Sequence, residues 1–206
     1  FLLPLTHFFV GATHMHFPRH LIALVATGLF ATASMAMTSA EHSVAKERIS
    51  AEYKASKAQC DALTENAKDV CVKQAKGAED IAKAELAAEY KPSEKAHYKV
   101  RKARADADYA VAKEKCDDHS GNDKDVCNKD AKAEHVKAIE NAKVAKAQAT
   151  PANSKPEKDA NVAEAKKEAA EEKREANYKA AKERCDALAG DVKSKCVDDA
   201  KRMYAQ

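Results

Sequence analysis

The chain uses one 24-residue unit three times, and this repeat constrains the fold more than any other feature. In each copy a tyrosine stands seven residues before a Cys-Asp pair, a second cysteine follows eleven residues after the first, and Ala-Lys closes the unit. The copies occupy residues 53–76, 109–132 and 178–201, and they contain all 6 cysteines. A unit that returns with its cysteines in register predicts one supersecondary structure built three times.

The spacing of the cysteines distinguishes a continuous helix from a hairpin. On one helix, eleven residues would separate the thiols by about 16 Å, whereas a disulfide requires Cα atoms within about 7 Å. The intervening segment favours a turn, because Gly121 and Gly190 are typical of helix C-termini and Asn66, Asn122 and Asp191 are favoured N-caps. We therefore interpret each unit as an antiparallel helical hairpin with a disulfide near its closed end. The predicted disulfides are Cys60–Cys71, Cys116–Cys127 and Cys185–Cys196.

The composition predicts helices throughout. Alanine, lysine and glutamate dominate after residue 40 and are strong helix formers, and no segment shows the alternation of a strand. Only 24 of the 166 residues from Glu41 onward are Val, Ile, Leu, Met, Phe or Tyr, too few to bury a substantial core. The predicted fold is all-α: three disulfide-stapled antiparallel hairpins in series, extended rather than globular.

Prolines divide the hairpins from one another. After residue 40 they stand only at 92, 151 and 156, outside the cysteine units, and they mark breaks between helices. If the cysteines lie opposite each other, the last hairpin is lopsided, because Gln206 pairs back only as far as Glu175. The charged segment 164–174 is then expected to project into solvent. The predicted segments are hairpin 1 at 37–92, hairpin 2 at 93–149, a linker at 150–158 and hairpin 3 at 159–206.

The first 36 residues carry the pattern of an export signal. Residues 1–14 are interpreted as sequence upstream of the natural start, and residues 15–36 as a signal peptide with Arg19 before an apolar core. Cleavage is expected after Ala36. The mature protein is then expected in the periplasm, without stable insertion in the membrane. The oxidising periplasm would permit the three disulfides.

Few residues suggest chemistry. Cys116, His119, Cys127 and His135 could supply thiolate and imidazole ligands to a metal, but the other units carry Leu63 and Leu188 in place of His119. The alternative is that His119 is a solvated residue at a helix end. We expect no enzyme activity, no cofactor and no metal, so that the six cysteines are the only predicted site residues. Nucleic-acid binding is not expected, because the 33 acidic residues are interleaved with 36 basic ones and leave no basic stripe.

Two resemblances bear on the function. The stretch Asn-Ala-Lys-Asp-Val-Cys at 66–71 and its relative Asn-Asp-Lys-Asp-Val-Cys at 122–127 resemble a group of uncharacterised exported bacterial proteins with repeated cysteine hairpins, sometimes labelled TolA-like cell-envelope proteins. The Ala/Lys/Glu-rich helical composition is similar to the periplasmic stalk of TolA itself. The resemblance implies a place in the cell envelope and assigns no functional residues.

The leading functional hypothesis is a non-enzymatic periplasmic helical-repeat protein that acts as an envelope-associated interaction or spacer element. Its expected partner is an envelope or periplasmic protein. Two alternatives stay open. One is a stress-protective hydrophilic helical protein, suggested by Ala-Lys-Glu-Lys stretches such as 112–115. The other is a metal-buffering protein that uses His119, His135 and reduced cysteines.

Overall fold

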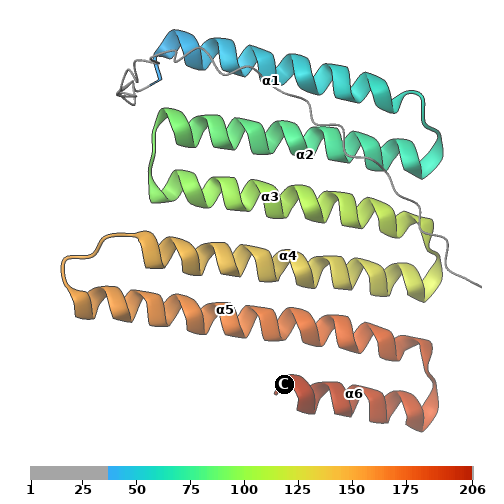
Figure 1. Ribbon diagram of the computed structural model, residues 1–206. Helices are drawn as coiled ribbons and strands as arrows, with labels where there is room; N and C mark the ends of the chain where they lie inside the picture. The colour runs from blue at the N-terminus through green and yellow to red at the C-terminus, as the bar shows by residue number, and fades with distance from the viewer. Residues whose placement is uncertain (1–36, 206) are drawn as a thin grey trace, which may run out of the picture. The chain divides into compact units, whose positions relative to one another are not determined.

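The computed structural model describes residues 37–205, which fold into six α-helices that alternate in direction (Figure 1). The predicted signal peptide, 15–36, and the upstream segment, 1–14, lie outside the described residues. None of the helices within 37–205 has the length and apolar character required to cross a membrane. The elements are α1 (Ser39–Cys60), α2 (Glu65–Tyr90), α3 (Glu94–Lys115), the 3₁₀ turn η1 (Cys116–Asp118), α4 (Gly121–Ala149), α5 (Lys155–Arg184), the 3₁₀ turn η2 (Cys185–Ala187) and α6 (Gly190–Tyr204).

Side-chain caps begin the helices at the open ends of the hairpins. Thr38 and Glu41 form a reciprocal capping box at the start of α1, and the Ser93 Oγ accepts a hydrogen bond from the Ala96 N–H at the start of α3. Ser154 caps α5 in the same way, with Pro156 in the first turn, where a missing N–H costs nothing. Consequently α5 begins at Lys155, inside the segment predicted as a linker, and the connection is only 150–154.

At the closed ends the predicted caps were wrong. Asn66, Asn122 and Asp191 each lie inside the first turn of a helix rather than at its N-cap. The chain reverses one residue earlier, through a left-handed backbone conformation that a glycine adopts without strain. The N-caps are Thr64, Ser120 and Ala189, and the left-handed residues after them are Glu65 (φ 51°), Gly121 (φ 54°) and Gly190 (φ 55°).

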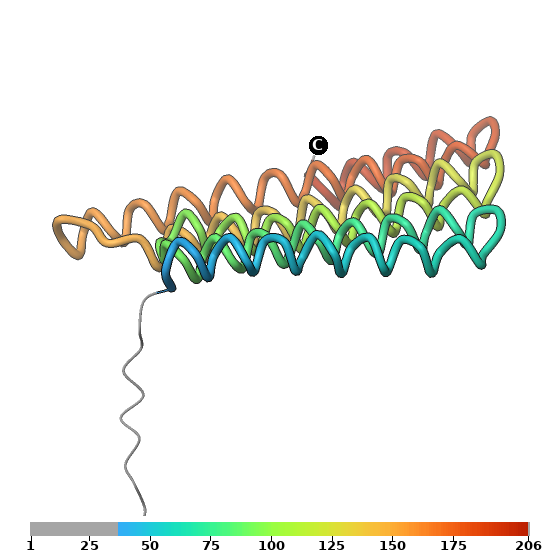
Figure 2. The backbone as a smooth tube through the Cα atoms, turned by 90° about the horizontal axis from the view of Figure 1, so that it is seen from above, coloured from blue at the N-terminus to red at the C-terminus, as the bar shows by residue number. Residues whose placement is uncertain are grey.

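The three hairpins pack side by side, so that within 39–204 each helix lies against its neighbours in the sequence (Figures 1 and 2). The helices α2 and α3 pack together between hairpins, as do α4 and α5. The expectation that 164–174 projects into solvent was therefore wrong, because Ala169 is only 2% exposed and the Lys173 Nζ donates a hydrogen bond to the Asn141 Oδ1 of α4 at 2.6 Å.

The core of this layer is made almost entirely of small side chains. Among the described residues, Ile49 and Leu86 are the only large aliphatic side chains that are buried, and the rest of the apolar core is alanine and cysteine. Alanine permits helices to approach closely but removes little apolar surface from water. The disulfides therefore supply much of what holds the two arms of each hairpin together.

Candidate functional site

The three predicted disulfides are present. Their Cα–Cα distances are 5.6 Å for Cys60–Cys71 and Cys116–Cys127 and 5.7 Å for Cys185–Cys196. A lysine–aspartate ion pair accompanies each disulfide across the turn, always at 2.9 Å. The pairs are Asp61–Lys68, Asp117–Lys124 and Asp186–Lys193. Each closed end is thus stabilised by a disulfide and by an ion pair, both formed by residues at equivalent positions of the repeat.

Equivalent ion pairs also join one hairpin to the next. Lys73 of α2 lies 3.6 Å from Glu114 of α3, and Lys129 of α4 lies 3.8 Å from Glu183 of α5. Each lysine stands two residues after its cysteine and each glutamate two residues before. In the third hairpin the lysine is replaced by Asp198. In the first two hairpins this lysine forms an ion pair with a glutamate of the next hairpin. The helix α6 lacks that lysine.

An aromatic contact in the second hairpin shows that the predicted register is correct to within one residue. Opposed cysteines would pair Tyr109 with residue 134, and the Tyr109 ring stacks on His135 with centroids 4.7 Å apart. The His135 Nε2 lies 2.8 Å from the Asp106 Oδ1. Burial raises the pKa of Asp106, but hydrogen bonds with Lys102 and His135 outweigh this effect and hold that pKa below its ordinary value of 3.8.

With the cysteines oxidised, as they are in this structure, the residues of the metal hypothesis are not grouped as ligands. Cys116 and Cys127 are bonded to each other, so neither offers a thiolate. His135 is engaged with Tyr109 and Asp106, whereas His119 lies exposed in the turn. Within residues 37–205, no group of three or more histidine, cysteine, aspartate or glutamate side chains is arranged to hold a metal ion.

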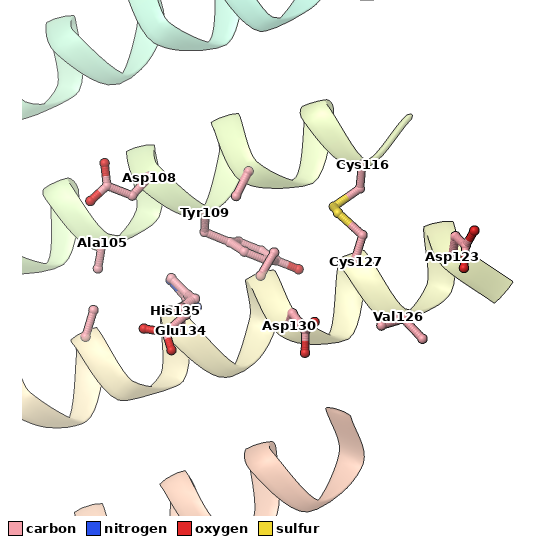
Figure 3. A pocket seen from close by; sticks show the side chains of 13 residues that line it. Ala105, Asp108, Tyr109, Cys116, Asp123, Val126, Cys127, Asp130, Glu134 and His135 are labelled. Carbon is pink, nitrogen blue, oxygen red and sulfur yellow. A yellow bond between two sulfur atoms is a disulfide. The ribbon is translucent and has the colours of Figure 1, made fainter. Parts of the chain in front are cut away.

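A groove of about 600 Å³ runs along one side of the second hairpin, between α3 and α4 (Figure 3). Its floor is apolar and consists mainly of alanines, Val126, the Tyr109 ring and the Cys116–Cys127 disulfide. Small side chains leave this space open because alanine does not fill the channel between two adjacent helices. The groove is therefore a direct consequence of the alanine-rich packing.

Carboxylates border this groove on both sides. Asp108 belongs to α3, and Asp123, Asp130 and Glu134 belong to α4. Asp130 is paired with Arg184 of α5 at 2.5 Å and Glu134 with Lys137 at 3.1 Å. Within the described part of the chain, Asp108 and Asp123 form no ion pair. We call these four carboxylates the acidic rim.

The features that the three repeats share do not reveal the acidic rim, which is visible in the sequence only in the differences between the repeats. Asp123, Asp130 and Glu134 lie seven and four residues apart, a spacing that places them on one face of a helix. The equivalent residues of the first hairpin are Ala67, Gln74 and Ala78. The position of Asp108 is also acidic in the first hairpin, as Glu52. The three carboxylates on α4 are thus a property of one hairpin and not of the repeat.

No protein-family description, curated protein or solved structure matches this chain.

Proposed function

We propose that this protein is a non-enzymatic helical-repeat scaffold, an interaction or spacer element associated with the cell envelope in the periplasm. The observation that carries the proposal is the repeated docking of the hairpins. The same disulfide, the same turn ion pair and the same inter-hairpin lysine–glutamate pair recur. Such stacking produces an extended surface, which repeat proteins use for binding.

The disulfides support the proposed compartment. They persist in oxidising environments such as the periplasm and are rare in reducing ones. All six cysteines of the described chain are bonded in pairs within their own hairpins. A core of alanines with two large aliphatic residues depends strongly on these bonds, which fits a protein that folds after export.

Site-specific photocrosslinking in intact cells tests this proposal. A photoreactive residue at Val192, which is 63% exposed, would sample the side of the layer that carries the groove. The same residue at Lys179, which borders a smaller groove on the other side, serves as the control. A defined crosslinked protein that forms from Val192 more strongly than from Lys179 is the expected result. Absence of any crosslinked partner, together with protection of a test enzyme during drying, would favour the stress-protective alternative.

A further inference from the structure

We propose that the groove of the second hairpin is the docking site for a basic amphipathic helix of a partner protein. The inference rests on the interaction role proposed above, and it names the surface and the chemistry of the partner. Two adjacent antiparallel helices with a channel between them offer the geometry in which a third helix packs, with its apolar stripe toward the channel. The apolar floor would contact the apolar stripe of that helix, and the acidic rim would contact its basic side chains.

The floor suits an apolar stripe. The Tyr109 ring, the disulfide and Val126 present apolar surface, and the neighbouring alanines leave room for larger side chains from outside. Leucine or similar residues of a partner would fill this space and remove apolar surface from water, which favours binding. No larger side chain of the second hairpin occupies the channel, which remains open over about 600 Å³.

The rim suits cations. Among the residues that line the groove, the acidic and basic side chains are four carboxylates and the His135 imidazole, with no lysine or arginine. The groove on the opposite side of α4 differs, because there Lys129, Lys132 and Lys179 are mixed with Glu172 and Glu175. The groove between α3 and α4 is therefore acidic, whereas the groove between α4 and α5 is mixed in sign. A lysine or arginine can lay its aliphatic stem along the alanines and place its charge at the rim.

The fold does not require the acidic rim. The first hairpin has the same disulfide, a tyrosine at the same position and a lysine over that ring, since Lys76 lies 5.9 Å from the Tyr53 centroid and Lys132 lies 5.5 Å from that of Tyr109. It nevertheless carries Ala67, Gln74 and Ala78 where the second hairpin carries acids. All three of these positions are exposed, so packing does not explain the difference.

The third hairpin extends the same face with apolar groups. The positions of Asp123 and Glu134 are taken there by Val192 and Met203, which are 63% and 73% exposed. These exposed apolar residues belong to the next hairpin, on the same face as the groove. A face that combines acidic and apolar surface fits a partner that is both basic and apolar, rather than one that is only charged. A single amphipathic helix presents both kinds of side chain at helical spacing.

Binding of a designed peptide to the full chain tests the proposal. The probe is an alanine-based helix of about 18 residues with leucines along one face and lysines on both flanks. Three control ligands are compared with this probe: the same peptide with glutamate in place of lysine, a basic peptide without leucine, and spermine. We expect the basic amphipathic peptide to bind with one-to-one stoichiometry in titration calorimetry, more weakly at about 300 mM than at about 50 mM salt.

Neutralising the rim should abolish most of this affinity. The variant Asp108→Asn/Asp123→Asn/Glu134→Gln should bind the peptide at least about tenfold more weakly, a change of about 1.4 kcal/mol. The matched control Glu164→Gln/Glu168→Gln/Glu171→Gln removes the same charge from exposed positions of α5 and should bind like the natural protein. An equal loss in both variants would show that only net charge matters and would overturn the proposal.

A graft supplies a gain of function. The variant Ala67→Asp/Gln74→Asp/Ala78→Glu transfers the rim to exposed positions of the first hairpin, and it should raise the stoichiometry to two peptides per chain. Failure of the natural protein to bind the peptide, or equal binding by spermine or the leucine-free peptide, contradicts the proposal. If a partner crosslinks in cells equally well to the rim-neutralised variant, the proposed scaffold function is supported, but the groove is not the site at which the partner binds.

Discussion

Gly77 of α2 lies directly against Ala107 of α3, where the first two hairpins pack together. A Cβ placed on Gly77 would lie 2.6 Å from the Ala107 Cβ and 3.4 Å from the Ala107 Cα. The neighbouring atoms belong to a rigid backbone and to a methyl group, neither of which can move aside. The docking of these hairpins therefore depends on the absence of one side chain.

The substitution Gly77→Ala should destabilise the protein, although alanine is the better helix former by about 1 kcal/mol. Overpacking at this contact is expected to reduce the free energy of unfolding by about 1–3 kcal/mol. Urea denaturation measures the change. The double variant Gly77→Ala/Ala107→Gly moves the gap to the facing helix and should recover much of the loss. A stabilised single variant would show that the two helices are not in contact at this point.

Glu65 is the weak point of the first turn. Its φ of 51° is close to those of Gly121 and Gly190 at the equivalent positions, and a residue with a Cβ pays about 1 kcal/mol or more in this conformation. The substitution Glu65→Gly should therefore raise the free energy of unfolding of the first hairpin, by up to about 1 kcal/mol. The reciprocal change Gly121→Ala should lower stability by a similar amount. Hydrogen exchange in α1 and α2 resolves the first effect, and unchanged protection there would contradict it.

Removal of one disulfide should strongly destabilise its hairpin. Each bond closes a loop of about 12 residues, for which the chain-entropy estimate is about 3 kcal/mol. The variant Cys116→Ser/Cys127→Ser should lose about that much stability, while its helical circular-dichroism signal at low temperature is largely retained because alanine and lysine favour helix locally. The control variant Asp117→Asn removes the exposed ion pair with Lys124 at the same turn and should cost less than about 1 kcal/mol. Comparable losses in the two variants would contradict this ranking.

Acid should destabilise the hairpins. Hydrogen bonds from Lys68 and Lys193 hold the pKa values of Asp61 and Asp186 below their ordinary 3.8. A hydrogen bond from Lys83 does the same for buried Glu79, whose ordinary pKa is 4.5, and prevails over the opposing effect of burial.

Folding lowers the pKa values of these carboxyl groups. Their contribution to stability is therefore complete at a pH above their pKa values in the unfolded chain, and it is lost as the pH falls through their pKa values in the folded protein. The melting temperature should be nearly constant between about pH 7 and pH 5 and should decrease below about pH 4.5. The variant Asp61→Asn/Asp186→Asn should show a shallower decrease. A melting temperature that rises on acidification would contradict the assignment.

The last helix should open first. The helix α6 has 15 residues against 30 in α5. Within the described residues it packs mainly on α5 and the adjoining turn η2, whereas α5 packs on both α4 and α6. Amide hydrogen exchange should therefore be fastest in 190–204, and segment 164–174 should be protected like α4. Fast exchange in 164–174 would instead support the solvent-projecting arrangement that the sequence suggested.

The sequence by itself determined the units of this protein. The spacing of the cysteines excludes a single helix for each pair, and Pro92 and Pro151 separate the hairpins. The helical class, the disulfides and, to within one residue, the register of the second hairpin could therefore be predicted, but not the caps of the turns. These features depend on local geometry and on covalent distance limits, which a linear pattern contains.

Only the tertiary structure decided how the hairpins meet. Their docking relies on alanines and on Gly77, which a sequence rich in alanine does not distinguish from residues that merely favour helix. The exposed or buried state of Ala169 depends on α4, which is a neighbour in space and not within the same hairpin. The groove likewise arises between two helices, where carboxylates far apart along the chain, Asp108 and Glu134, come to border one channel. Such contacts are set by the packing distance between helices, and no local pattern in the sequence specifies that distance.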